Sequence, residues 1–171
     1  FTETNIKKIK FNSKNEFSFK INNKLEFKEI AISSKINFKE VQILKNMNLK
    51  NLLPELKDDI SFLNHEIDLK YKKNFLSING NGKIIIQKFE DLISYKIEKN
   101  KDKLTFENTF KINKNPLFLD LLNYKKNDEA EAIIKFNGYI NEKNKAYIQS
   151  ATLVEEKNKI EINDIYFDKN L

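Results

Sequence analysis

The sequence predicts a mainly β fold, an antiparallel meander of about nine to eleven strongly twisted strands with one or two short helices. Two observations support this. Apolar and polar residues alternate along most of the chain, as expected for strands with one buried face. Short polar segments separate the alternating runs, and helical crossovers long enough to join parallel strands are missing between them.

The alternation assigns many large side chains to one face of the predicted sheet. Polar residues such as Thr105, Glu107 and Lys135 fall between them and are expected to face the other way. The apolar positions expected to share a face are Phe17, Phe19, Ile67, Leu69, Tyr71, Ile93, Tyr95, Ile97, Leu104, Phe106, Phe110, Ile112, Ile134, Phe136 and Ile140.

Turn signals divide these runs. We expect hairpin turns in the polar stretches at residues 22–24, 99–102, 141–145 and 156–159. A weak internal echo links residues 76–80 with residues 134–138, because each is an apolar, alternating segment that ends in Asn-Gly. Asn-Gly is typical of a hairpin turn, but it is also found at a bulge within a long strand, and the pattern leaves both interpretations open.

Two stretches have some helical character. In residues 47–59 the leucines fall at helical spacing, but Pro54 should end or kink a helix, so we expect short turns that plug an end of the sheet. In residues 115–124, Asn115 and Pro116 suit a helix start, whereas Leu117, Leu119 and Leu121 alternate as in a strand. Helix and strand are both open for this second stretch.

Composition limits the classes of function. The net charge is +6, but every basic residue is lysine, which lacks the bidentate fork with which arginine grips phosphates. There is no cysteine, which removes disulfides and thiolate chemistry, and no apolar run approaches the roughly 18 residues of a membrane-spanning helix. The chain opens on Phe1 without a signal-peptide pattern, so we expect one β-rich segment, residues 1–171, cut from a longer protein.

Catalytic and metal-binding constellations are not recognisable. His65 is the only histidine and is interpreted as an ordinary polar residue before a strand. The adjacent acid pairs, such as Glu90-Asp91 and Glu155-Glu156, would point to opposite faces of a strand. Gly80-Asn81-Gly82 lacks the remaining residues of a phosphate loop. We therefore expect no enzymatic activity, no cofactor and no metal.

The aromatic residues raise the question of nucleic-acid binding, which uses exposed rings among basic residues. Here Phe and Tyr are expected to share faces with Ile and Leu, while the lysines take the opposite face. A nucleic-acid or anionic-surface binding module is therefore kept only as a second alternative.

The one-sided apolar pattern needs a cover, because soluble proteins rarely expose a broad apolar surface. A second sheet would give a structural or protein-interaction β-sandwich without a small ligand. Acyl chains could instead cover part of an open sheet, and the pattern by itself does not separate the two.

Residues 60–171 resemble the periplasmic repeat regions of the AsmA-like family, which includes TamB and YhdP. The resemblance rests on Asp-Leu-Leu-Asn-Tyr-Lys-Lys at residues 120–126, on Ala-Ile-Ile-Lys-Phe-Asn-Gly at residues 132–138 and on the lysine-rich hairpin that follows. Residues 75–95 are of similar character, whereas residues 1–59, the first strands and the short plug, carry little of it.

This resemblance implies a strongly curved, groove-like or half-barrel sheet with an apolar inner surface lined by the fifteen residues above. It implies a periplasmic location in a protein anchored to the inner membrane of a Gram-negative bacterium. The implied function is non-catalytic: binding phospholipid acyl chains and moving phospholipid between the inner and outer membranes. Neighbouring β segments of the same chain would be the other partners.

Overall fold

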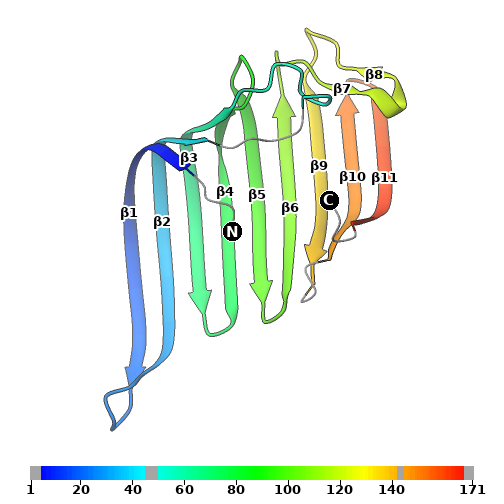
Figure 1. The fold of residues 1–171 in the computed structure, drawn as a ribbon. Coiled ribbons are helices and arrows are strands. Elements are labelled where there is room, and N and C mark those ends of the chain that lie inside the picture. The colour runs from blue at the N-terminus through cyan, green and yellow to red at the C-terminus, as the bar shows by residue number, and fades with distance from the viewer. Residues whose placement is uncertain (1–4, 45–49, 142–144, 168–171) are drawn as a thin grey trace.

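A computed structural model of the chain describes residues 5–44, 50–141 and 145–167. Its main feature is one nine-stranded antiparallel sheet in the order β1-β2-β3-β4-β5-β6-β9-β10-β11, so almost every strand pairs with its sequence neighbours (Figure 1). The sheet is open, since β1 and β11 form its two edges. The strands are β1 Asn5–Ile21, β2 Phe27–Leu44, β3 Asp59–Lys72, β4 Phe75–Ile85, β5 Asp91–Asn100, β6 Lys103–Ile112, β9 Ala132–Ile140, β10 Ala146–Glu155 and β11 Asn158–Phe167.

The predicted antiparallel meander is confirmed, and three predicted turns fall where expected, after β1, after β5 and after β10. The fourth, at residues 141–145, lies mostly outside the described residues. The two Asn-Gly pairs of the echo, Asn79-Gly80 in β4 and Asn137-Gly138 in β9, lie inside strands and not in turns. Each sits beside a register irregularity in the neighbouring strand, between Leu63 and Glu66 of β3 and between Ile148 and Ser150 of β10.

Residues 113–131, between β6 and β9, form the small second sheet and the only helix among the described residues. The elements are β7 Phe118–Leu119, the 3-10 helix η1 Asp120–Leu122 and β8 Tyr124–Lys125. Strand and helix were both open for residues 115–124, and the chain uses both in short pieces. Asn115 does not cap a helix, because its amide bonds to the backbone of Phe89 instead.

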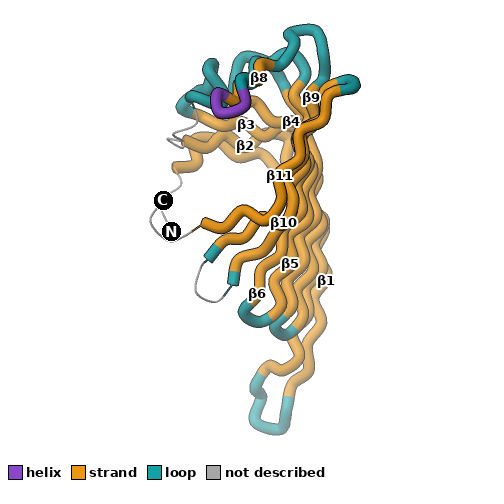
Figure 2. The backbone as a smooth tube through the Cα atoms, turned by 90° about the vertical axis from the view of Figure 1, so that its right-hand side faces the viewer, coloured by secondary structure: helices purple, strands orange, loops and turns teal. Residues whose placement is uncertain are grey.

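Residues 50–58 and 113–131 together make what we call the cap, at the end of the sheet where β2, β4, β6 and β10 finish. Figure 2 shows these loops overhanging one face of the sheet. The short turns predicted for residues 47–59 are found in the described part, residues 50–58, which contains turns and bends but no helix. Pro54 cannot donate a helical hydrogen bond, and the backbone N–H of Lys57 donates to the carbonyl of Ile86 in the neighbouring loop.

The principal hydrophobic core lies between the cap and one end of the sheet. Cap residues Leu53, Leu56 and Leu117 pack on strand residues that include Ile60, Ile84, Ile112 and Leu153. Backbone hydrogen bonds join the two cap segments, from Phe118 N to Leu52 O, and close the second one, from Lys126 N to Leu117 O. The cap thus plugs one end of the sheet, as expected from the leucines, and its only helix among the described residues is the three-residue η1.

Replacing Leu117 by alanine tests this core. Leu117 is 0% exposed, so Leu117→Ala should lower the free energy of unfolding by about 3 kcal/mol through lost burial and a residual cavity. Leu122 belongs to the same cap segment but is 47% exposed, so Leu122→Ala should change it by no more than about 0.5 kcal/mol. Urea unfolding measures both, and equal effects would show that the cap is not packed as described.

Candidate functional site

The candidate site is the face of the main sheet on which the cap lies, which we call the apolar face. Strand register defines it, because residues directly opposite each other in antiparallel strands share a face. Three neighbouring rows of directly paired residues cross β4, β5, β6 and β9. In strand order, the first row is Gly82, Ile93, Phe110 and Ile134. The second is Gly80, Tyr95, Asn108 and Phe136, and the third is Ile78, Ile97, Phe106 and Gly138. The rows run on into β3 and β10.

All fifteen residues predicted to share a face do so by this register, but their environments differ. Ile112 is fully buried beneath the cap. Phe17, Phe19 and Tyr71, near the β1 edge, are exposed. The other members are half-buried: Ile67, Leu69, Ile93, Tyr95, Ile97, Leu104, Phe106, Phe110, Ile134, Phe136 and Ile140. The cap therefore covers one end of the face and leaves the rest accessible.

Glycines make room for aromatic rings on the apolar face. A Cβ atom at Gly80 would collide with the ring of Tyr95 from the adjacent strand. At Gly138 it would collide with the carbonyl oxygen of Tyr147 and would crowd the ring of Phe106. The two Asn-Gly segments of the sequence echo thus have a common role: each lets a neighbouring aromatic ring lie down across its strand.

His65 lies within β3 on this face and is 2% exposed, so its interpretation as a polar residue ahead of a strand was wrong. It has the same parity along β3 as Ile67 and Leu69, so it points toward the apolar side opposite Gly82, where it stacks on Tyr95 at 5.5 Å between ring centroids. His65 Nε2 lies 3.2 Å from the hydroxyl of Tyr95, and Nδ1 has no hydrogen-bond partner. Burial lowers the pKa of His65, so the ring is uncharged at neutral pH and consistent with its apolar surroundings.

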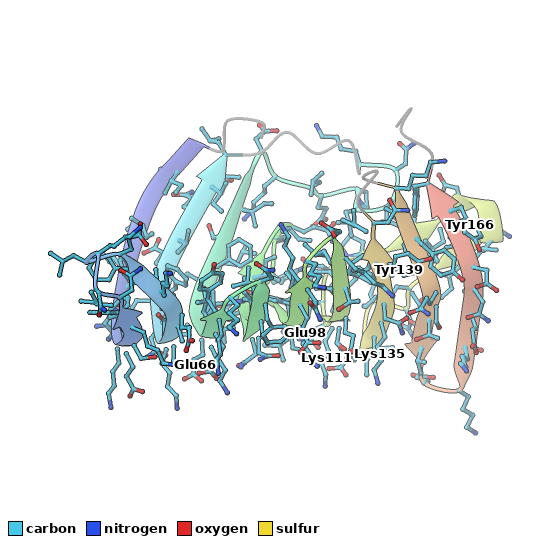
Figure 3. All side chains as sticks on the ribbon, turned by 90° about the horizontal axis from the view of Figure 1, so that it is seen from below. Glu66, Glu98, Lys111, Lys135, Tyr139 and Tyr166 are labelled. Atoms are coloured by element: carbon cyan, nitrogen blue, oxygen red, sulfur yellow. The ribbon has the colours of Figure 1, made fainter. Side chains whose placement is uncertain are left out.

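The opposite face of the sheet is polar and solvated. Figure 3 shows Glu66, Glu98, Lys111 and Lys135 along this side. Half-exposed ion pairs span it, such as Lys96 with Glu98 at 3.1 Å, and each contributes little stability. These charged side chains keep the polar face hydrated.

Three tyrosines depart from the predicted separation of aromatic residues from lysines. By register, Tyr139, Tyr147 and Tyr166 lie side by side on the polar face, with centroids 5.0 Å and 4.6 Å apart. Lys103 lies over the Tyr139 ring at 4.4 Å, and the Tyr147 hydroxyl donates to Asp164, which raises the pKa of Tyr147. The rings contact one another at tilted angles, and Tyr166 on the edge strand β11 is 75% exposed.

A buried polar cluster under the cap was not predicted. Asp91 and Asn115 are fully buried, and Asn115 Nδ2 donates to Asp91 Oδ2 at 2.6 Å. Nearby, Glu155 accepts hydrogen bonds from the hydroxyl of Tyr124 at 3.0 Å and from the backbone of Asn127 at 2.6 Å. These bonds attach residues 113–131 to β5 and β10, so the cluster positions the cap over the apolar face.

Sites of other kinds are not found in the part of the chain that the structure describes. In that part, no three His, Asp or Glu side chains gather in a way that could hold a metal ion. Within residues 5–44, 50–141 and 145–167, no helix has the length and apolar character needed to cross a membrane.

Searches against protein-family models, curated proteins and solved structures find no match to this chain. The AsmA-like resemblance therefore stays a hypothesis carried by the residue pattern.

The buried carboxyl group of Asp91 predicts a pH dependence of stability. Burial raises its pKa, and the hydrogen bonds from Asn115 and Asn113 only partly oppose this. A carboxyl whose pKa is higher in the folded chain contributes stability below its unfolded pKa, about 4, and loses it as the pH rises through the folded value. Between about pH 4 and pH 7 the native chain should therefore lose more unfolding free energy than Asp91→Asn, which cannot titrate there.

Urea unfolding at a series of pH values measures this difference. Asp91→Asn is expected to be less stable in absolute terms, because its amide would place a second N–H group opposite Asn115 Nδ2. Only the pH dependence is compared, and parallel profiles for the two proteins would contradict the assignment.

Proposed function

We propose that the apolar face binds the acyl chains of phospholipids and that the chain is a non-catalytic lipid-binding segment of a longer, AsmA-like protein. One observation carries the proposal: a half-exposed apolar face continues across the nine-stranded sheet, and within the described residues only the cap packs on it. The β-sandwich alternative needs a second covering sheet, and the described residues contain only the two-residue strands of the cap.

Leaving this apolar face in contact with water has a free-energy cost. Each 100 Å² of apolar surface in water forgoes about 2.5 kcal/mol relative to burial. Soluble monomers rarely expose contiguous apolar patches beyond a few hundred Å², and larger ones usually mark binding sites. A ligand that covers the face should therefore be apolar and extended.

Acyl chains match the shape and chemistry of the face. The nine strands of the sheet, at about 4.8 Å spacing, extend over roughly 38 Å, long enough for an acyl chain to lie across several of them. Few polar side chains interrupt the middle of the face. Asn108 is one, and His65 is another, but the His65 ring is uncharged because burial lowers its pKa. A curved, half-barrel form of the sheet would hold such chains in a groove, with the cap closing one end.

The AsmA-like resemblance supports the same reading and supplies the cellular context. On that basis the segment belongs to a periplasmic protein anchored in the inner membrane, which moves phospholipid toward the outer membrane. Each edge strand, β1 and β11, pairs on one side only among the described residues. Neighbouring β segments of the same chain would pair with these edges and lengthen the lipid-binding face.

Photo-crosslinking at adjacent positions on opposite faces tests the proposal. A benzophenone-bearing residue in place of Phe106, on the apolar face, should form phospholipid adducts in cells that make the full-length protein. The same residue in place of Thr105, on the polar face, should not. Mass spectrometry of the labelled protein detects the adducts, and equal labelling at both positions or at neither would contradict lipid binding.

A charge on the same face gives an independent check. Phe106 is half-buried in an open surface, so Phe106→Lys should leave the fold intact, because the ammonium group can reach water. It should also lower the amount of lipid that co-purifies, whereas Thr105→Lys should not. Global unfolding by Phe106→Lys, seen by circular dichroism, would instead indicate a dry core at this position.

A further inference from the structure

The hairpin between β1 and β2 extends beyond the rest of the sheet. Pairing of β2 with β3 ends at Ala31 and Lys72, whereas β1 and β2 stay paired as far as Ile21 and Phe27 (Figure 1). Residues 27–30 of β2 therefore have no partner in β3. We call residues 17–30 the hairpin tip, and it lies at the end of the sheet opposite the cap.

Large apolar side chains cover one side of the hairpin tip and are exposed there. Phe17 is 66% exposed, Phe27 is 61% exposed, and Phe19 and Ile21 lie beside them on the apolar face. Phe19 and Phe27 contact edge to face at 4.9 Å, which leaves their outer surfaces free. A two-stranded hairpin of this kind has no second layer of its own to bury these side chains.

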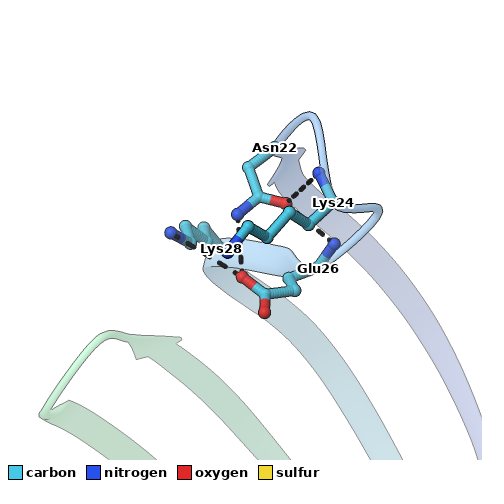
Figure 4. A network of polar contacts seen from close by, with 4 residues as sticks. All are labelled: Asn22, Lys24, Glu26 and Lys28. Atoms are coloured by element: carbon cyan, nitrogen blue, oxygen red, sulfur yellow. Dashed lines mark hydrogen bonds and ion pairs between the residues drawn. The ribbon is translucent and has the colours of Figure 1, made fainter.

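The turn fixes an apolar residue at the extreme end. Asn22 Oδ1 accepts hydrogen bonds from the backbone N–H groups of Lys24 and Glu26, both at 3.0 Å, and Asn22 Nδ2 donates to Glu26 at 2.8 Å (Figure 4). Leu25 is held between them with φ 60° and is 80% exposed. The left-handed region disfavours a residue such as leucine, so an exposed leucine is poorly explained by local folding alone.

Lysines accumulate at the same end of the sheet. Lys20 and Lys28 lie on the polar side of the tip, paired with Glu29 at 2.6 Å and Glu26 at 4.0 Å. The turns beside the tip add Lys72 and Lys73 after β3, and Lys99, Lys101 and Lys103 around the turn after β5. The loops of the cap end mix both signs of charge, since Asp128, Glu129, Glu131 and Glu156 lie among lysines such as Lys57, Lys88, Lys114 and Lys125.

We propose that the hairpin tip inserts Phe19, Leu25 and Phe27 into the surface of an anionic phospholipid bilayer, with the lysines of that end on the lipid phosphates. A bilayer suits this combination, because it offers apolar depth below a layer of negative charge. A folded partner protein would need a shaped groove for the protruding tip. Nucleic acid would use the lysines and could stack bases on the phenylalanines, but it has no use for the exposed Leu25 at the extreme end.

This inference rests on the proposed function and gives it an entry point. Phe17 lies opposite Ile32, Ile32 opposite Tyr71, and Tyr71 opposite Leu76, so one row of the apolar face begins at the tip. Acyl chains that leave the bilayer at the tip would meet apolar side chains along this row before reaching the half-buried middle of the face.

Tryptophan fluorescence tests the insertion directly, because the native chain contains no tryptophan. Leu25→Trp should show a blue-shifted emission on vesicles of phosphatidylethanolamine and phosphatidylglycerol, and a much smaller shift on phosphatidylcholine alone. Leu122→Trp, an exposed leucine of the cap, is the matched control and should show no shift. Leu25→Ser with Phe27→Ser should weaken flotation with the anionic vesicles roughly tenfold or more, whereas Leu122→Ser should not.

Three results would overturn the inference. The first is vesicle binding without a shift at position 25, which would mean electrostatic adsorption only. The second is DNA binding as tight as vesicle binding and unchanged in the serine variant, which would favour nucleic acid. The third is a blue shift at position 25 that appears without vesicles and increases with protein concentration, which would favour contact with a second copy of the chain. Lipid adducts at Phe106 are scored separately, so failure at the tip is distinguishable from failure of the lipid-binding face.

Discussion

The structure depends on how one apolar face of an open sheet is kept from water. The polar face needs no cover, because lysines and carboxylates alternate along it and stay solvated. The apolar face does need one, and the chain supplies it only at one end, where Leu53, Leu56 and Leu117 bury Ile112 and its neighbours. The distribution of core, exposed surface and candidate site follows from this partial cover.

The cap can serve as a partial cover because its own polar groups are satisfied. A loop segment packed on a sheet brings backbone N–H and carbonyl groups with it, and burying them unpaired would be costly. Asn115 binds both backbone groups of Phe89, and Glu155 accepts the backbone N–H of Asn127. The buried carboxylates are therefore explained by attachment of the cap, and no chemistry needs to be assigned to them.

Away from the cap the face changes gradually in character. The middle rows are half-buried by their own neighbours, since Tyr95 and Phe106 lie across Gly80 and Gly138. Toward β1 the apolar side chains become exposed and end in the protruding hairpin tip. The two proposals use this gradient: acyl chains occupy the middle of the face, and a bilayer surface covers the tip.

Alternation of side chains along a strand is a local property, so the sequence by itself determined the strands, most turns and the shared face of the fifteen apolar residues. It did not determine the tyrosine row so readily, because a bulge in β10 inserts a residue and reverses the phase of that strand, so that Tyr147 falls on the polar face. Only the tertiary structure decided which residues meet under the cap. Asp91, Asn115 and Glu155 are far apart in the chain, and no spacing rule links them. The tertiary structure also decided that, within the described residues, the second sheet is only the two-residue strands of the cap and leaves most of the apolar face uncovered. Period-two alternation could not decide this, since it looks the same whether the apolar side meets another sheet, a cap or a ligand.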